Sequence, residues 1–511
     1  MKKLSLISLL LAFVICFLAQ IASAAAAPLR FKVGIDPSLG QTQPVSGRLL
    51  IFMTANQKPL ETIAPDFLNP QSVYVTGMEV RNIEPGKIIE VNPDSLETFP
   101  AAFSAAPAGD YQIMALLDEN HSYPYNGMGA GDLSSNVIKM SLPLADSPPQ
   151  LTLTKKVPER APDVPANVRI IEFVSPALSA FWGRPITMQA SVFLPPSYDQ
   201  SKTQKYPTVY NVHGYGGTHL GPIRGAAQLT KAMSDGKRPE MIYVYLNANC
   251  SLGHHVFADS ANNGPWGRAL TTEFIPYLEK QFRMDGNVSG RFLTGHSSGG
   301  WSTLWLQVNY PDVFGGTWST SPDPVDFHSF TGPDLTLATP QNFFHGADGK
   351  PYNLIRDQGK DVMSFEDYGR LERAEGYYGG QMASFEAVFG PKGDDGQPMP
   401  LFDRDTGRIN PVVQKAWGKY NISQILQDNW KTLAPKLKGK IHIIVGTADT
   451  FHLDEAVRLL DARLKSLGSD AKIDYIEGRT HFDLYKDGLG DRIANEMYAL
   501  ARPKAKAAVI K

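Results

Sequence analysis

The residues from Arg291 to Gly300 carry the strongest chemical signal in this chain of 511 residues. A short apolar run enters a Gly-x-Ser-x-Gly turn centred on Ser297, and a helix-like segment, Trp301–Val308, follows. On a tight strand-to-helix turn the serine hydroxyl is exposed, and glycines two residues away on either side let neighbouring chains pass closely. The N-terminal end of the helix favours developing negative charge. The pattern predicts that Ser297 is a nucleophile.

A glycine-rich segment, His213-Gly-Tyr-Gly-Gly217, directly follows the strand-like run Thr208–Val212. In sheets that carry such a nucleophile, the loop after an early strand contributes one backbone N–H to an oxyanion hole, and the residue after the nucleophile contributes the other. These donors are predicted to be the N–H groups of Tyr215 and Ser298. The alternative is a glycine-rich turn with a structural His213.

A carboxylate and an imidazole follow late in the chain. The strand-like run Lys440–Val445 leads into Gly-Thr-Ala-Asp449, so the carboxylate lies at the carboxyl end of a strand, where catalytic groups collect in open α/β sheets. His481 comes after the last predicted strand. Asp449 is predicted to orient His481, which would act as the base for Ser297. Asp454 is the rival acid, but its place in the first turn of a predicted helix already explains an aspartate there.

These residues need a sheet that holds them at one edge. From Val168 onward, short continuous apolar strands alternate with helix-like segments, which indicates a mostly parallel sheet covered on both faces. Between about residues 321 and 435 this rhythm breaks, and the stretch is predicted to be an insertion over one end of the sheet. Residues 166–511 are therefore expected to form a doubly wound α/β-hydrolase fold with a cap-like insertion.

Residues 25–146 are predicted to form a β-sandwich-like domain. Apolar and polar residues alternate between Leu29 and Asp36, and further short apolar runs are separated by Gly, Pro, Asn and Asp clusters. Residues 147–165 are rich in Pro and charge, and an extended linker is expected there. Because no catalytic candidate precedes residue 213, the catalytic unit is expected to work without the β-domain.

The first 24 residues are predicted to be a signal peptide. Lys2 and Lys3 precede an apolar run, and Ala22-Ser-Ala24 offers the small residues that signal peptidase needs. An uncleaved membrane anchor is the alternative. Cleavage would leave one cysteine, Cys250, and no intramolecular disulfide. The formal net charge of −2 suggests neither nucleic acid nor an anionic surface as partner. A secreted or periplasmic protein without membrane association after cleavage is expected.

Two weaker signals concern substrate binding. The segment Asn247–Trp266 gathers histidines and amides after a strand-like run, and His255 and Trp266 are predicted to contact the substrate. Adjacent histidines rarely ligate one ion together, so no metal site is expected. Trp301, just after the nucleophile turn, is predicted to line the same pocket, although aromatic residues at such positions often belong to the core.

Five motifs together resemble the putative-esterase family, which includes esterase D, feruloyl esterases, enterochelin esterases and the antigen 85 acyltransferases. They are Phe193-Leu-Pro-Pro-Ser-Tyr198, Lys205-Tyr-Pro-Thr-Val-Tyr210, His213–Gly217, Gly295–Gly299 and Gly446–Asp449. The resemblance covers roughly residues 168–500 and implies a cofactor-free acyl-transfer enzyme with a Ser/His/Asp triad. The long insertion and the N-terminal β-region depart from the compact members. Both leave the substrate open, because caps shape acyl and leaving-group pockets.

The expected function is that of a secreted serine esterase that cleaves a small-molecule or glycan-linked ester through an acyl-enzyme. The alternatives are a serine peptidase or an acyltransferase with the same machinery. A peptidase would need a site for a peptide backbone or N-terminus, and the sequence gives no signal of one. A third hypothesis, a glycan-binding β-domain with an inert hydrolase unit, would predict a damaged triad, and no part is missing.

Overall fold

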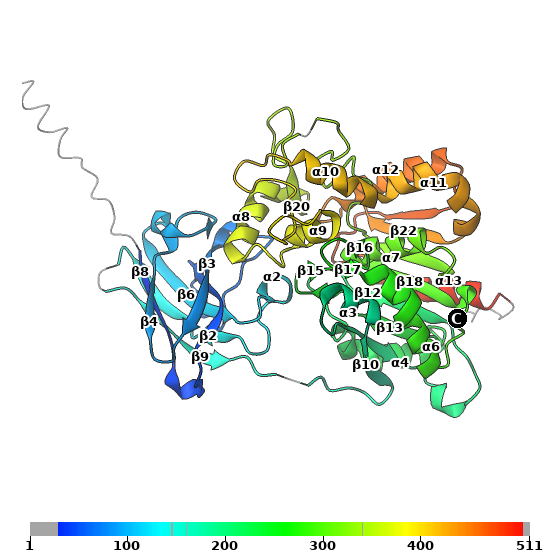
Figure 1. Cartoon of the computed structure of the whole chain (residues 1–511), viewed down its shortest axis with the longest axis horizontal. Coiled ribbons are helices and arrows are strands. Elements are labelled where there is room, and N and C mark those ends of the chain that lie inside the picture. Colours follow the sequence, from blue (N-terminus) through cyan, green and yellow to red (C-terminus); the bar gives the residue numbers. More distant parts are fainter. Residues whose placement is uncertain (1–28, 145–146, 160, 340, 504–511) are drawn as a thin grey trace, which may run out of the picture.

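The computed structural model describes residues 29–144, 147–159, 161–339 and 341–503. The predicted signal peptide lies outside these residues. Two large sheets lie apart, and helices α8 (Phe365–Glu375) and α9 (Gln381–Phe389) lie between them (Figure 1). Within the described ranges, no helix is both long and apolar enough to cross a bilayer.

The C-terminal sheet has eight strands in the order β10-β11-β13-β12-β18-β19-β22-β23. In this order, β13, β12, β18, β19, β22 and β23 pair in parallel, whereas β10 pairs antiparallel with β11 and β11 antiparallel with β13. Their bounds are β10 (Val168–Val174), β11 (Thr187–Phe193), β12 (Thr208–Val212), β13 (Ile242–Leu246), β18 (Arg291–His296), β19 (Gly316–Thr320), β22 (Ile441–Gly446) and β23 (Lys472–Ile476). The predicted mostly parallel, doubly wound sheet is confirmed.

Helices cover both faces of this sheet, which explains its continuous apolar strands. Successive side chains of β12 pack on opposite faces of the sheet. Val209 packs with α4 (Ala226–Ser234) and α13 (Leu489–Ala501), whereas Tyr210 lies in the core on the other face. That opposite side is covered by α6 (Ile275–Gln281), α7 (Ser298–Asn309), α11 (Ile422–Leu437) and α12 (Leu453–Ser466).

The insertion between β19 and β22 has its own structure. The hairpin of β20 (Asn353–Asp357) and β21 (Lys360–Ser364) leads into α8, then α9 and α10 (Pro411–Trp417). A capping box between Ser364 and Asp367 starts α8. Helix α9 was not anticipated. The Arg404 guanidinium is buried between Glu372 and Glu386, at 3.2 and 2.9 Å.

The N-terminal region forms one nine-stranded sheet in the order β4-β1-β9-β7-β6-β2-β3-β5, with β8 on β6. A two-layer sandwich is therefore not confirmed. The strands are β1 (Phe31–Ile35), β2 (Val45–Thr54), β3 (Val73–Ile83), β4 (Ile88–Val91), β5 (Thr98–Phe99), β6 (Gly109–Asp118), β7 (Leu133–Ser135), β8 (Ile138–Leu142) and β9 (Gln150–Lys156).

The linker expected over residues 147–165 is wrong in its first half, because β9 lies there and pairs with β1 and β7. Leu151 and Leu153 alternate with threonines and are fully buried, which is the period-2 mark of a strand. The prolines on both sides of this short run led to the prediction of a linker instead of a strand.

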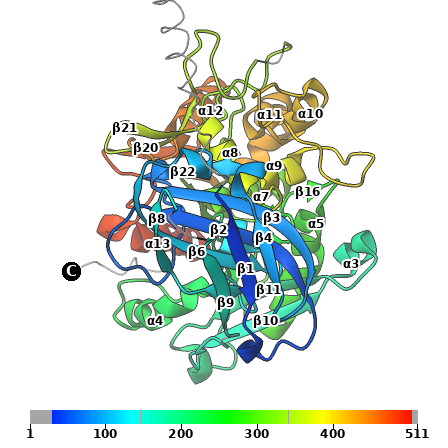
Figure 2. The same ribbon diagram turned by 90° about the vertical axis from the view of Figure 1, so that its left-hand side faces the viewer.

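The N-terminal sheet also buries its second face. Along β2, Leu49 and Ile51 pack into the region's own core, whereas Leu50 and Phe52 join a core that includes residues of α8 and α9. Figure 2 shows this sheet spread in front of the insertion and the second sheet. The β-region and the insertion thus share one hydrophobic core.

Candidate active site

The turn from β18 into α7 holds Ser297 in a strained conformation, with φ 60° and ψ −127°. A Cβ at Gly299 would overlap the Val212 carbonyl oxygen, and a Cβ at Gly295 would lie 2.8 Å from the same atom. The Ser297 N–H donates to the Thr320 carbonyl oxygen at 3.0 Å. Glycines are needed because the end of β12 runs directly against this turn.

The structure brings His481 and Asp449 together. The Nδ1 of His481 and Oδ2 of Asp449 are 2.9 Å apart, and the Phe451 N–H donates to Oδ1 at 3.0 Å. Burial by itself would raise the pKa of the Asp449 carboxyl, but the hydrogen bond and charge of His481 outweigh burial and hold that pKa below its usual value. The rival Asp454 instead pairs with Arg356 at 2.9 Å.

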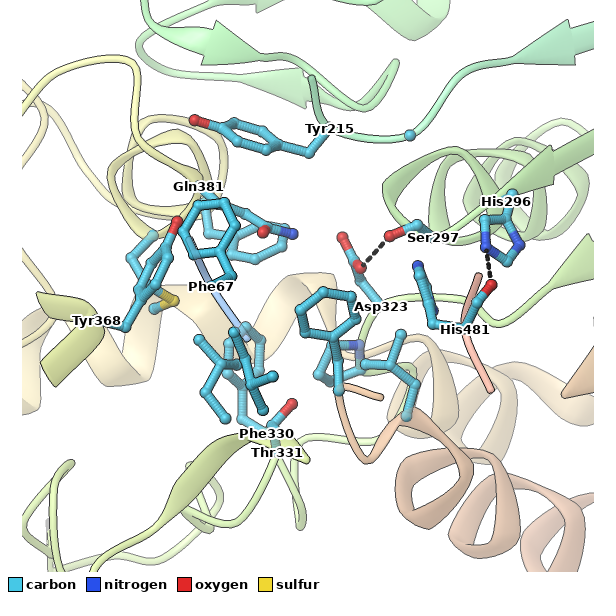
Figure 3. A pocket seen from close by; sticks show the side chains of 18 of the residues that line it. Phe67, Tyr215, His296, Ser297, Asp323, Phe330, Thr331, Tyr368, Gln381 and His481 are labelled. Atoms are coloured by element: carbon cyan, nitrogen blue, oxygen red, sulfur yellow. Dashed lines mark hydrogen bonds between the residues drawn. The ribbon is translucent and has the colours of Figure 1, made fainter. Parts of the chain in front are cut away.

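A second buried carboxylate, Asp323, contacts the nucleophile turn. The Ser297 hydroxyl donates to its Oδ1 at 3.4 Å (Figure 3). The Ser298 hydroxyl donates to its Oδ2 at 2.5 Å. Asp323 is 3% exposed, and burial raises the pKa of its carboxyl to about 6. Within the described residues, the structure has no hydrogen bond between Ser297 and His481. Sequence reasoning missed Asp323, although it follows β19 at the edge where Asp449 follows β22.

His296 braces the loop that carries His481. Its Nε2 lies 3.0 Å from the His481 carbonyl oxygen, and the two rings are 4.3 Å apart (Figure 3). Burial and the neighbouring His481 lower the pKa of His296 to about 3, so its ring is neutral. A neutral Nε2–H that donates to this carbonyl fixes the His481 backbone.

The glycine-rich loop after β12 meets the nucleophile turn. A Cβ at Gly214 would lie 3.2 Å from the Ser297 Cβ, so the two backbones approach closely, and Tyr215 and Ser298 are the next residue on each chain. His213 holds the loop: its Nε2 accepts the Ala248 N–H at 2.9 Å. The two predicted oxyanion donors thus come from segments in contact.

A cavity of about 500 Å³ opens in front of Ser297 and His481. Its lining is mostly aromatic and aliphatic, and it comes from the second sheet, the insertion and, through Phe67, the N-terminal region. The lining residues are Phe67, Gly214, Tyr215, Gly217, His296, Ser297, Asp323, Pro324, Phe330, Thr331, Leu354, Ile355, Phe365, Tyr368, Gln381, Met382, Phe385, Phe451, Leu453, His481, Phe482 and Tyr485. Such a cavity suits an apolar, ring-containing ligand.

A family model described as "Putative esterase" matches residues 183–483, which include the nucleophile turn, Asp449 and His481. The chain belongs to this family. The protein is therefore an esterase, a hydrolase of carboxylic esters.

Individual relatives of this esterase are distant. An endo-1,4-beta-xylanase/feruloyl esterase of Xylanibacter ruminicola is 27% identical over 132 residues, which are 25% of this chain and 18% of that protein. A ferulic acid esterase structure has 16% identity and a TM-score of 0.42, and the match covers 65% of this chain and 98% of that one. An S-formylglutathione hydrolase structure from Agrobacterium tumefaciens has 15% identity and a TM-score of 0.37, and the match covers 65% of this chain and 95% of that one. At such TM-scores the likenesses carry no argument about substrate.

The predicted substrate contacts of the esterase are wrong at three positions. His255 and Trp266 are 0% and 4% exposed and stack on each other at 3.7 Å, and Trp301 is 1% exposed in the core around α7. None of the three lines the cavity. The segment Asn247–Trp266 turns inward because its polar groups serve the structure: the His254 Nε2, for example, lies 3.0 Å from the His213 carbonyl oxygen. No cluster of three or more potential ligands for a metal occurs in the described ranges.

Proposed function

We propose that this esterase is a secreted serine esterase in which Ser297 is the nucleophile, His481 the base and Asp449 the acid that orients it. The observation that carries the proposal is the His481–Asp449 hydrogen bond of 2.9 Å at the cavity that Ser297 also lines. The order serine, aspartate, histidine along the chain fits this fold. The signal-peptide pattern of the first 24 residues supports secretion.

The reaction begins when the Ser297 hydroxyl rotates from Asp323 to the Nε2 of His481. His481 takes the proton as the serine oxygen attacks the ester carbonyl carbon, and the N–H groups of Tyr215 and Ser298 stabilise the oxyanion. The imidazolium then protonates the leaving alcohol. Water attacks the acyl-enzyme by the same steps and releases the acid. Catalytic hydrogen bonds are often formed only in the substrate complex, which suits the serine position seen here.

The cavity favours an ester with an aromatic or branched apolar acyl group. Phe330, Phe365 and Phe385 of the insertion line the cavity, and the rings of Phe451 and Phe482 lie next to the His481 ring. The name of the Xylanibacter relative joins a glycanase to a feruloyl esterase. A glycan-linked or small-molecule ester of an aromatic acid is the substrate class that fits both observations.

Labelling with a fluorophosphonate and turnover of an aromatic ester test this proposal. Ser297→Ala should abolish labelling and lower kcat by about 10⁴-fold or more while the fold remains. Ser298→Ala, one residue away, should still be labelled, because its backbone N–H is kept. Labelling that persists in Ser297→Ala would refute the assignment.

The same machinery serves the two alternative functions, so the substrates must separate them. Turnover of a p-nitrophenyl ester is compared with turnover of an aminoacyl-arylamide, and an added alcohol tests acyl transfer. The proposal expects the ester to be cleaved far faster than the amide, with water as the main acceptor. Faster amide cleavage would indicate a peptidase, and a dominant ester product with the added alcohol would indicate an acyltransferase.

A further inference from the structure

Asp323 differs in character from the rest of the cavity. It follows β19 in the segment Ser-Pro-Asp-Pro, and it is the one Asp or Glu among the described lining residues. No Lys or Arg belongs to that lining. A carboxylate placed in an aromatic cavity without a cation costs free energy unless hydrogen-bond donors reach it.

Two serine hydroxyls supply those donors when no substrate is bound. Ser298 donates to Oδ2 at 2.5 Å, and Ser297 donates to Oδ1 at 3.4 Å. The first contact lies at the start of α7 and does not depend on catalysis. The second is long and comes from the nucleophile itself.

Catalysis removes the second donor. When Ser297 attacks, its proton passes to His481, and in the acyl-enzyme the serine oxygen carries the acyl group and can no longer donate. The Oδ1 of Asp323 then faces the cavity without that donor. A buried acceptor that loses its partner is destabilised, so a substrate that replaces the donor gains most in the transition state and the acyl-enzyme.

The position of Asp323 relative to the serine oxygen indicates which part of the substrate could carry this donor. Oδ1 is 3.4 Å from the serine oxygen that bonds to the acyl carbon. A hydroxyl or amino group on the carbon next to that carbonyl comes within hydrogen-bond distance of an acceptor so placed when it points toward Asp323. A carboxylate at the same position would meet a like charge.

We propose that Asp323 selects esters whose acid carries a hydrogen-bond donor on the carbon next to the scissile carbonyl, namely α-hydroxy or α-amino acids with an aromatic side chain. This deepens the proposed esterase function and rests on it. Asp323 is thus a specificity residue, which contacts the acyl group and takes no proton from it.

Four ethyl esters that differ at one position test the proposal. They are the esters of 3-phenylpropanoate, 3-phenyllactate, phenylalanine and benzylmalonate (the monoester), with hydrogen, hydroxyl, amino and carboxylate on the α-carbon. Each kcat/KM is divided by the rate of hydroxide-catalysed hydrolysis of the same ester, which removes the intrinsic effect of the substituent. The wild type should favour the hydroxyl and amino esters over phenylpropanoate by about tenfold to a hundredfold, and the carboxylate ester should be the poorest.

Two matched variants connect the selectivity to the residue. Asp323→Asn keeps an acceptor for Ser298 but removes the charge, so the preference for the amino ester should fall by about tenfold or more and the carboxylate ester should improve. Asp326→Asn makes the same change three residues on, at a carboxylate that is 1% exposed, contacts His328 and does not line the cavity. It should keep the wild-type order.

Equal corrected rates in the wild type, or an unchanged order in Asp323→Asn, would overturn the proposal. A preference found only when the donor is placed on the alcohol would overturn its acyl-side assignment. If Asp323→Asn does not fold, the wild-type series alone decides. Failure of the wild type to cleave even ethyl 3-phenylpropanoate and the other three esters would count against the proposed function itself.

Discussion

Three buried carboxylates follow strands β19 and β22, namely Asp323, Asp449 and Asp454, and their partners distinguish their proposed roles. Asp449 accepts from His481, Asp454 is paired with Arg356, and Asp323 accepts from two serines. A carboxylate that orients an imidazole must contact its Nδ1, and Asp449 alone of the three does so in the described residues. The ion pair with Arg356 accounts for the burial of Asp454 without a catalytic role, in agreement with the proposal.

We predict opposite outcomes for the two rival acids. Asp449→Asn leaves His481 in the wrong tautomer and should lower kcat by about 10³–10⁴-fold at neutral pH. Asp454→Asn breaks the ion pair with Arg356 and should cost on the order of 1–3 kcal/mol of stability, with kcat close to wild type. Steady-state kinetics and urea unfolding of both variants measure the two effects. A large kcat loss confined to Asp454→Asn would reverse the assignment.

The pH dependence of the free energy of unfolding tests whether the Asp323 carboxylate is buried away from water when it is ionised. Its pKa is raised to about 6 in the folded protein, whereas the unfolded chain has about 3.9. The folded state binds this proton more tightly, so the stability from this group is full below about pH 4 and is lost as the pH rises through about 6. Linkage makes the difference roughly 3 kcal/mol at most.

Asp323→Asn has no such titration and should therefore gain stability relative to the wild type between about pH 4.5 and about pH 7.5. Urea unfolding of both proteins at the two pH values measures the gain as a difference, which cancels the other titrating groups. Parallel changes in the two proteins would mean that the Asp323 carboxylate is solvated.

At the scale of elements, the glycine-rich loop after β12, which we propose supplies an oxyanion-hole donor, is held by parts of the chain far from it. The Tyr215 hydroxyl lies 2.5 Å from the carbonyl oxygen of Pro124, in helix α2 (Tyr123–Asn126) of the N-terminal region, and 2.6 Å from that of Gly379, before α9. Burial raises the pKa of this phenol well above its usual value, so it remains a donor. The position of the Tyr215 N–H therefore depends on the β-region and the insertion together.

We predict that Tyr215→Phe lowers kcat by about tenfold or more with little change in KM, because displacing an oxyanion donor affects the transition state more than substrate binding. Tyr125→Phe is the matched control. It removes a phenol hydroxyl from helix α2, which the Tyr215 hydroxyl contacts, and within the described residues the Tyr125 hydroxyl makes no hydrogen bond. This variant should behave as wild type. A thermal midpoint close to wild type excludes unfolding. Equal kcat values in the two variants would show that the anchor does not position the loop.

At the scale of the whole molecule, the N-terminal region is part of the esterase rather than an appendage. Leu50, Phe52 and Met114 pack in one core with the insertion, and Arg48 donates to the Glu375 carbonyl oxygen at 2.6 Å. Phe67 reaches the cavity. The expectation that the catalytic unit works without this region conflicts with these contacts.

A chain that starts at Pro165 should consequently aggregate or lose most of its ester turnover. Its insertion would expose the apolar face that the β-region covers, and exposed apolar patches promote association. Size-exclusion chromatography and turnover of a small activated ester measure both effects against the full chain. A monomeric truncate with full activity would show that the shared core is dispensable.

Local patterns in the sequence predicted many of the strands, although not β9, and the glycine-flanked turn at Ser297, with Asp449 and His481 after later strands. Glycine spacing and short apolar runs act over a few residues, and residues at the carboxyl ends of parallel strands meet at one edge of a sheet whatever surrounds it.

Only the tertiary structure decided which side of each segment faces the cavity. His255, Trp266 and Trp301 have residue types that suit a binding site, yet packing turns them into the core, whereas Asp323 and Phe67 come from segments without a motif and line the cavity. Contacts between residues far apart in the chain, such as that of Tyr215 with Gly379, 164 positions later, depend on how the β-region, the insertion and the sheet pack together. No local pattern encodes that packing, because it minimises the exposed apolar surface of the whole chain at once.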